Sequence, residues 1–300
     1  MNERSLRFKI VDILLIALMI LPLVAGIALK VLTTPASNGI EITGARVYWE
    51  IPMPLQNLTI TESQINSWLV MLTVLGLALY MTHGLAIKPQ TKRQLLAEWA
   101  VEKVKDLVSD NMGARFMAFV PFIASIMVIS ALSSLMSLIG LRPPTADMNV
   151  VAGWAVVVFI IITYYKLKGG LFPYVKGFFE PVPIFAPFNI IGELATPVSM
   201  SFRHYGNVLS GVVIATLISS ALGGLSEMLL GWLPGFLGDI PFLRVGIPAV
   251  LSVYFDVFSG LMQAFIFAML TMLYVATGFP EEEYEKRQAK KKKKKALPAA

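Results

Sequence analysis

Six long apolar stretches run through this chain of 300 residues, and they decide what kind of fold it can form. They lie at about 13–29, 68–85, 116–141, 150–165, 187–222 and 245–278. Stretches of this length are typical of helices that cross a lipid bilayer, whose hydrocarbon core is about 30 Å thick. Only 15% of the residues are charged, whereas soluble domains carry roughly a quarter. We therefore predict an all-α polytopic membrane protein with about six hydrophobic helices.

The last two apolar stretches, about 187–222 and 245–278, are each longer than 30 residues. A helix of that length spans about 50 Å at roughly 1.5 Å per residue, well beyond the hydrocarbon core. We therefore expect both helices to be long and steeply tilted, with a kink at Pro197. A further segment, about 95–108, mixes charged and apolar residues, and we expect it to form one amphipathic interfacial helix.

The alternation of apolar and polar segments divides the chain into four parts. Residues 1–33 form an extra N-terminal transmembrane helix or a signal-like segment, and the length of the apolar run favours a retained helix. Residues 34–66 are polar and rich in Pro, Thr and Asn, which indicates an extracytoplasmic segment. Residues 67–278 hold the remaining membrane helices, and residues 279–300 form a charged cytoplasmic tail.

Basic residues are unevenly distributed between the apolar stretches. Segments 1–12, 86–115, 166–186 and 279–300 hold 20 of the 25 Lys and Arg residues. Because cytoplasmic loops are enriched in these residues, we expect both termini in the cytoplasm and six spans between them. The same bias accounts for the net charge of +6, so we predict no nucleic-acid partner. With no Cys and only two His, we expect no metal site, no cofactor and no covalent catalysis.

Arg203 lies in the middle of the fifth apolar stretch, where a charged side chain costs about 3 kcal/mol on insertion scales. Thr196, Ser199, Asn207 and Ser210 are spaced three or four residues apart around it, so they share one helical face. Ionisable residues inside a membrane face protein or water and usually mark functional sites. We predict that Arg203, with Ser199 and Asn207, belongs to a transport path. A structural polar seam between helices is the alternative.

The sixth apolar stretch carries a second polar series, formed by Ser252, Asp256, Ser259 and Gln263. The spacing places Asp256 and Gln263 two turns apart on one face of a regular helix. If this face meets the other polar stripe, the Gln263 amide is placed to hold the guanidinium of Arg203. Asp256 is then either an exchangeable group on a hydrated path or a simple ion-pair partner of that arginine.

Four other polar residues give weaker signals. Glu193 lies ten residues before Arg203, and we place it near the cytoplasmic end of the tilted helix. Asp147 and Asn149 stand in the outer hairpin, where capping of the following helix is the simpler role. His204 points about 100° away from its neighbour, and we interpret it as a packing residue.

Several of these motifs together resemble a known family. They are the segments Pro187–Glu193 and Pro197–Asn207, the block Gln263–Phe267 with Leu270, Thr271 and Tyr274, the hairpin Pro144–Val150, and the shorter matches Lys88–Pro89 and Pro121–Ile123. In this combination and order they resemble subunit a of F-type ATP synthases, over about residues 60–278. The arginine block and the glutamine block at this separation make the resemblance specific.

The resemblance implies a non-catalytic stator subunit in the bacterial plasma (inner) membrane. It implies a ring of c subunits and b-type peripheral stalk subunits as partners, in addition to the lipid bilayer. Two offset half-channels would carry ions to and from carboxylates of the ring, and Arg203 would couple that transport to rotation. The chain departs from the family pattern at Val212, Asp256 and Ser137, where relatives often carry other ionisable residues. Its polar relay is therefore built differently.

A secondary transporter that binds an anionic substrate at Arg203 is the main alternative function. Such transporters usually contain internal repeats and paired broken helices, and the sequence has no such repeat. A structural scaffold is a third class, but it would not need Arg203. The sequence leaves open whether the ion is H⁺ or Na⁺, the number of ring subunits, and whether synthesis or hydrolysis of ATP dominates.

Overall fold

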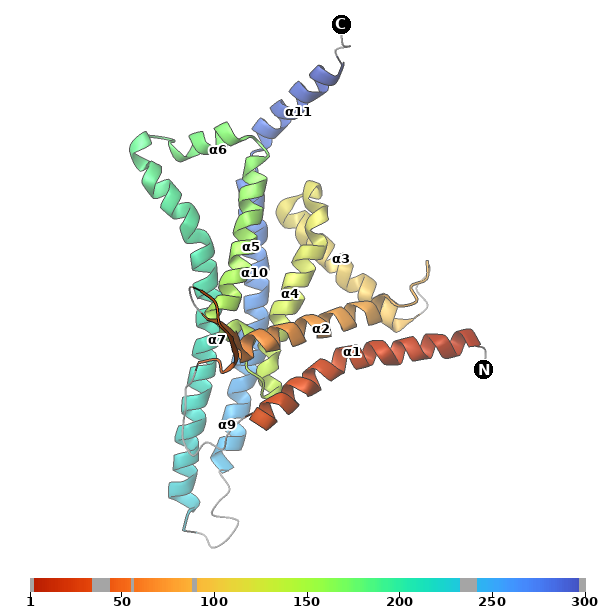
Figure 1. The fold of residues 1–300 in the computed structure, drawn as a ribbon, viewed down its shortest axis with the longest axis vertical. Coiled ribbons are helices and arrows are strands. Elements are labelled where there is room, and N and C mark those ends of the chain that lie inside the picture. The colour runs from red at the N-terminus through yellow and green to blue at the C-terminus, as the bar shows by residue number, and fades with distance from the viewer. Residues whose placement is uncertain (1–2, 34–43, 55–56, 88–90, 233–241, 297–300) are drawn as a thin grey trace.

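The computed structural model describes residues 3–33, 44–54, 57–87, 91–232 and 242–296 (Figure 1). Within them, six helical segments are long and apolar enough to cross a membrane: Phe8–Thr33, Glu62–Thr82, Ala114–Ile139, Met148–Leu167, Pro183–Leu230 and Phe242–Gly278. Each corresponds to one of the apolar stretches of the sequence. The prediction of an all-α polytopic membrane protein with about six hydrophobic helices is confirmed.

The helices that make up these spans have the following bounds. They are α1 (Glu3–Thr33), α2 (Glu62–Thr82), α4 (Val120–Leu135), α5 (Met148–Leu167), α7 (Ala186–Leu230), α9 (Phe242–Ser252) and α10 (Gly260–Gly278). Short 3-10 turns at Ala114–Phe119 and Met136–Ile139 extend α4 at both ends. A π-helical segment, Val253–Ser259, joins α9 to α10.

The shorter elements lie between and after the spans. The amphipathic α3 (Lys92–Met112) is longer than predicted, α6 (Leu171–Phe178) follows α5, and α11 (Glu281–Ala296) makes the charged tail helical. The segment before α2, expected only to be polar, contains an antiparallel hairpin of β1 (Val47–Ile51) and β2 (Leu58–Thr61). The rest of the predicted outer segment, 34–43, and the lysine side chains of 290–295 lie outside the described residues.

The two long helical elements are tilted relative to the first two helices. Helix α7 has 45 residues, which corresponds to about 68 Å at 1.5 Å per residue. Figure 1 shows α1 and α2 side by side, crossing the direction of α7 and α10 at a wide angle. Because α1 and α2 have lengths suited to spanning a bilayer, the longer helices must run obliquely through it.

Helix α10 lies in the centre of the bundle and packs against α3, α4, α5 and α7. Its fully buried Phe267 and Met272 belong to the main apolar core, to which Ile123 of α4 and Val158 of α5 also contribute. Figure 1 shows α7 outside this centre, on the far side of α5 and α10 from α3. One face of α7 is therefore available to another protein or to lipid.

The polar loops gather into two groups, and each group joins segments that the sequence predicts to lie on the same side of the membrane. Arg115, before α4, forms an ion pair of 3.1 Å with Glu281 of the C-terminal tail, and both belong to segments predicted to be cytoplasmic. Asn66 of α2 donates a hydrogen bond of 2.9 Å to the carbonyl oxygen of Arg142, which lies in the hairpin predicted to face outward. Which group faces the cytoplasm stays a prediction from the distribution of Lys and Arg.

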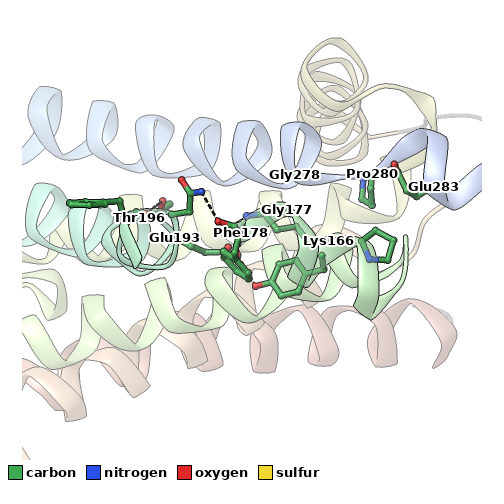
Figure 2. Close-up of a pocket in the computed structure, with 13 residues that line it drawn as sticks. Lys166, Gly177, Phe178, Glu193, Thr196, Gly278, Pro280 and Glu283 are labelled. Atoms are coloured by element: carbon green, nitrogen blue, oxygen red, sulfur yellow. Dashed lines mark hydrogen bonds and ion pairs between the residues drawn. The ribbon is translucent and has the colours of Figure 1, made fainter. Parts of the chain in front are cut away.

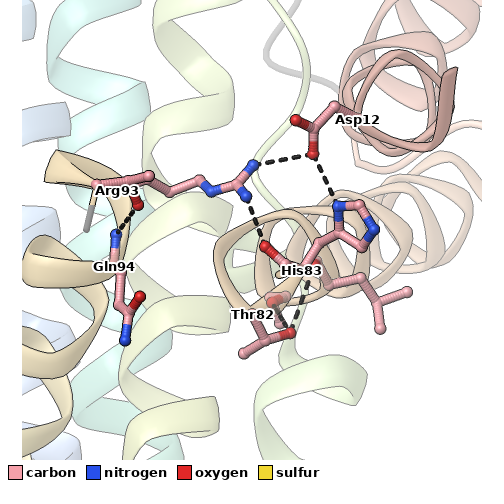
Figure 3. A network of polar contacts seen from close by, with 8 residues as sticks. Asp12, Thr82, His83, Arg93 and Gln94 are labelled. Carbon is pink, nitrogen blue, oxygen red and sulfur yellow. Dashed lines mark hydrogen bonds and ion pairs between the residues drawn. The ribbon is translucent and has the colours of Figure 1, made fainter. Parts of the chain in front are cut away.

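Polar contacts attach the beginning of α1 to the rest of the chain (Figure 3). The Asp12 carboxylate accepts a hydrogen bond of 2.9 Å from Arg93 at the start of α3 and lies 3.0 Å from Nδ1 of His83. The guanidinium of Arg93 also stacks on Tyr80 of α2, 4.6 Å from the ring centre. The hydrogen bond to Asp12 raises the pKa of Arg93 above its ordinary value, against the opposing effect of partial burial.

The middle and the end of α1 are attached as well. A Cβ atom added at Gly76 of α2 would lie 2.9 Å from the backbone nitrogen of Met19, so the two helix backbones are in direct contact. The ammonium group of Lys30 donates to the carbonyl oxygen of Gly140. Helix α1 is therefore packed into the fold along its whole length, which agrees with a retained helix.

Candidate functional site

Arg203 lies on the exposed face of α7, near the middle of the helix. Among the described residues it forms no hydrogen bond and no ion pair. Ser199 and Asn207, one turn before and after it, are exposed on the same face. A Cβ atom added at Gly206 would find no atom within 4 Å. The polar stripe predicted from helical spacing thus exists, and no described element of the chain covers it.

Asn207 connects the arginine stripe to α10. Its side-chain nitrogen donates a hydrogen bond of 2.8 Å to Oε1 of Gln263, whose side chain is 2% exposed. The prediction that the two polar faces meet is therefore correct for this pair. The expected direct contact differs, because Gln263 bonds to Asn207 and not to Arg203, which points to the exposed surface. Asn207 thus lies between the guanidinium of Arg203 and the buried amide of Gln263.

The π-helical segment Val253–Ser259 changes the position of Asp256. In a regular helix, Asp256 would share the face of Gln263. A π-turn holds one additional residue, which moves the preceding side chains by about 100°. Phe255 instead packs on α7, with its Cβ 3.2 Å from a Cβ placed at Gly211. The prediction that Asp256 shares one helical face with Gln263 is therefore wrong.

Asp256 is half-buried and forms no ion pair with Arg203 among the described residues. The structure thus gives no support to the ion-pair alternative. Segments of π-helix are uncommon and often occur at functional sites. The carboxylate of Asp256 has no ion-pair partner among the described residues, which agrees better with an exchangeable group.

Glu193 lies at the loop end of α7 in a network of polar contacts (Figure 2). Its Oε1 accepts hydrogen bonds of 3.0 Å from the ammonium group of Lys166 on α5 and 3.0 Å from the hydroxyl of Tyr174 on α6. Burial and the neighbouring carboxylate raise the pKa of Tyr174 to about 12, so this hydroxyl remains a donor at neutral pH. The sequence placed Glu193 at this end of the helix but gave no sign of its two partners.

A pocket of about 600 Å³ opens beside this network, and we call it the inner pocket. Lys166, Tyr174, Glu193, Thr196 and Glu283 are among the residues that line it. Glu193 and Thr196 also line a smaller pocket of about 220 Å³ between α5, α7 and α10. Thr196 belongs to the same helical stripe as Arg203, so the inner pocket leads to the beginning of that stripe.

Asp147 and Asn149 lie at a second pocket, at the opposite group of loops. Asp147 caps α5 by accepting a hydrogen bond of 3.0 Å from the backbone nitrogen of Asn149, as the simpler interpretation predicted. Both residues also line a pocket of about 610 Å³ between the β-hairpin, α2 and α5, which we call the outer pocket. Asn57 of the hairpin region and Trp154 of α5 complete its wall.

The amino-acid sequence of the chain is similar to that of known proteins. The family model of the ATP synthase A chain matches residues 64–276, which begin within α2 and end within α10. The chain belongs to the ATP synthase subunit a family. Subunit a of Priestia megaterium is 33% identical over 238 residues, which cover 74% of this chain and 94% of that protein. Subunit a of Acidothermus cellulolyticus is 34% identical over 213 residues, covering 68% and 71%.

A third relative of this subunit a family is the "ATP synthase subunit a, sodium ion specific" of Propionigenium modestum. It is 27% identical over 277 residues, which cover 81% of this chain and 88% of that protein. Family membership and the six spans make the chain an ion-translocating, multi-pass subunit of a bacterial F-type ATP synthase membrane sector. The secondary-transporter alternative is not favoured.

Proposed function

We propose that Arg203 couples ion transport to the rotation of a ring of c subunits, as a fixed cation between two half-channels. The observation that carries this proposal is the exposure of Arg203 in a membrane-spanning helix, without a partner among the described residues. A charged group in that place needs a partner from another subunit or from water, because lipid solvates it poorly. Carboxylates on a neighbouring ring would meet this need.

The chemistry of arginine suits this role. A guanidinium stays protonated at any cellular pH, whereas a buried lysine loses its proton readily. A fixed cation lowers the pKa of each carboxylate that passes it, and so releases the bound ion. A carboxylate that returns to lipid must first be neutralised, which requires an ion from the other half-channel. Asn207 and Gln263 border this site and hold α7 against α10.

The two pockets supply the aqueous access that half-channels require. We assign the inner pocket, with Glu193, to the cytoplasmic half-channel, because it lies among the loops richest in Lys and Arg. We assign the outer pocket, with Asp147 and Asn149, to the opposite half-channel. Ser199 and Asp256 are the further ion-path residues, on α7 and in the π-helical segment.

The remaining features of the subunit follow from this arrangement. We propose that it is non-catalytic, needs no cofactor, lies in the plasma (inner) membrane with both termini in the cytoplasm, and contacts b-type stalk subunits as well as the ring. We also propose that α1 is a permanent transmembrane helix. The contacts of Asp12, Met19 and Lys30 with the rest of the chain support this proposal, because cleavage of α1 would expose the surface of α2 on which it packs.

ATP-driven ion pumping tests the proposal. The whole ATP synthase, with Arg203→Ala in this subunit, is reconstituted in vesicles, and pumping is measured together with ATP hydrolysis. We expect hydrolysis to continue and coupled pumping to be lost. Ser210→Ala is the control, because within the described parts of the chain Ser210 bonds only to carbonyl oxygens of its own helix. Normal coupled pumping by Arg203→Ala would refute the proposed role.

A further inference from the structure

His204 is the next residue after Arg203, but it occupies the opposite environment. Its side chain is 0% exposed, whereas Arg203 is on the surface of α7. The imidazole lies between three helices. Nε2 is 3.3 Å from Oγ of Ser130 on α4, and the ring packs edge-on against Trp154 of α5 and Phe267 of α10 at 5.9 and 5.5 Å.

One nitrogen of this buried ring lacks a partner in the part of the chain that the structure describes. Nδ1 of His204 is buried and forms no hydrogen bond with any described residue. Native proteins rarely leave a buried polar atom unpaired, so the unpaired nitrogen needs an explanation beyond packing. A relay has a different requirement. It needs one nitrogen that receives a proton and a second that is free to release it.

The outer pocket reaches this histidine through a single side chain. Trp154 lines that pocket and also contacts the ring of His204. Polar groups continue along α4 from Ser130. Ser133 is fully buried, with a hydroxyl that has no partner among the described residues, and Ser134 follows it. Unpaired hydroxyls in a buried seam are the sites where ordered water binds. His204 therefore lies between the outer pocket and the arginine site.

On its other side, His204 is one helical turn from Asn207, which bonds to Gln263. Its polar and aromatic contacts come from α4, α5 and α10, and none of them is a charged side chain. Arg203, its neighbour in sequence, points away to the surface. No described acid stabilises the imidazole in its cationic form, and burial disfavours that form, so a proton that reaches the ring is readily given up again.

We propose that His204 is a relay residue of the outer half-channel, and that the ion passing it is therefore a proton. This rests on the proposed function, which it extends. Ser130 gives its hydroxyl proton to Nε2 and regains one from water on the pocket side. The imidazolium then releases the Nδ1 proton to water near Arg203, which leaves a neutral ring with its proton on Nε2. A half-turn of the ring brings the unprotonated nitrogen back toward Ser130 before the next proton arrives. No other bond forms or breaks, and a sodium ion cannot follow this route.

The test uses the whole ATP synthase in vesicles without Na⁺, with ATP hydrolysis and subunit content confirmed for each variant. The wild type should pump protons. His204→Gln keeps a polar group near Ser130 but cannot carry a proton through a ring. It should pump about a hundredfold more slowly, the lower end of what a positioned proton-transfer group contributes. Replacing H₂O with D₂O should slow the wild type more than this variant, which a purely structural role would not produce.

A pair of serine variants keeps the test valid if His204→Gln does not assemble. Ser130→Ala removes one oxygen atom from the relay and should slow pumping. Ser201→Ala removes another buried hydroxyl, which among the described residues bonds only to the Pro197 carbonyl, and it should pump normally. Wild-type pumping by Ser130→Ala, wild-type pumping by an assembled His204→Gln, or a requirement for Na⁺ would overturn the relay.

The Arg203→Ala variant separates this inference from the proposed function. If it loses coupled pumping while His204→Gln pumps normally, the relay is wrong and the role of Arg203 stands. If it pumps normally, the proposed function itself fails.

Discussion

The hydrogen bond between Asn207 and Gln263 gives the sharpest test of how α7 and α10 are held together. Asn207→Leu removes the donor and leaves Oε1 of Gln263 buried without a partner. An unsatisfied buried acceptor costs about 1–3 kcal/mol, while hydrogen bonds between membrane helices average about 0.6 and reach about 1.7 kcal/mol. We therefore expect Asn207→Leu to destabilise the subunit by about 1–2 kcal/mol. This corresponds to a shift of about 5- to 30-fold in the unfolding equilibrium.

A double-mutant cycle isolates this bond. SDS-induced unfolding of the purified membrane sector is measured for Asn207→Leu, Gln263→Leu and the double variant. Because the double variant leaves no unsatisfied amide, it should be less destabilised than the sum of the single variants, by about 0.6–1.7 kcal/mol. Ser199→Ala, on the exposed face, should change stability by less than about 0.5 kcal/mol. Additive single effects would show that the two side chains do not interact, and would refute the reasoning.

Three further predictions test other parts of the structure. Gly76→Leu should push α1 away from α2 and lower the stability of the subunit by about 1–3 kcal/mol in the same SDS assay. Gly224→Ala should not lower it, because there is open space around Gly224, and equal effects of the two variants would contradict the close packing of α1 on α2. Tyr174→Phe should slow pumping by the same factor at every pH between about 6 and 9, because a pKa of about 12 keeps the wild-type hydroxyl protonated over that range. A factor that changes with pH would show that the hydroxyl titrates. Asp256→Asn should slow pumping more than Asp147→Asn. Asp256 lies in a π-helical segment without an ion-pair partner among the described residues, whereas Asp147 mainly caps a helix. Equal small effects of the two variants would remove Asp256 from the ion path.

Hydropathy and helical spacing predicted those parts of the fold that depend on one segment at a time. Each of the six spans corresponds to one apolar stretch, because the cost of placing polar backbone in lipid makes such stretches helical. The stripe of Ser199, Arg203 and Asn207 follows directly from a regular helix. The capping role of Asp147 was visible for the same reason, since it depends on adjacent residues.

Features that depend on contacts between segments could not be predicted in this way. The sequence does not show that Gln263 bonds to Asn207, that Glu193 meets Lys166, or that His204 is enclosed by three helices. The π-helical segment at Asp256 was missed because residue spacing assumes 3.6 residues per turn. The contacts between distant segments and the change of helix geometry at Asp256 appear only in the packed structure.

The central claim is that Arg203 acts through its fixed positive charge on another subunit. The most direct measurement is ATP-driven pumping by the whole complex with Arg203→Lys, which keeps a basic residue but allows it to lose its proton when buried against the ring. The account predicts that ATP hydrolysis continues while coupled pumping is lost, as in Arg203→Ala. Normal pumping and ATP synthesis by Arg203→Lys would contradict it.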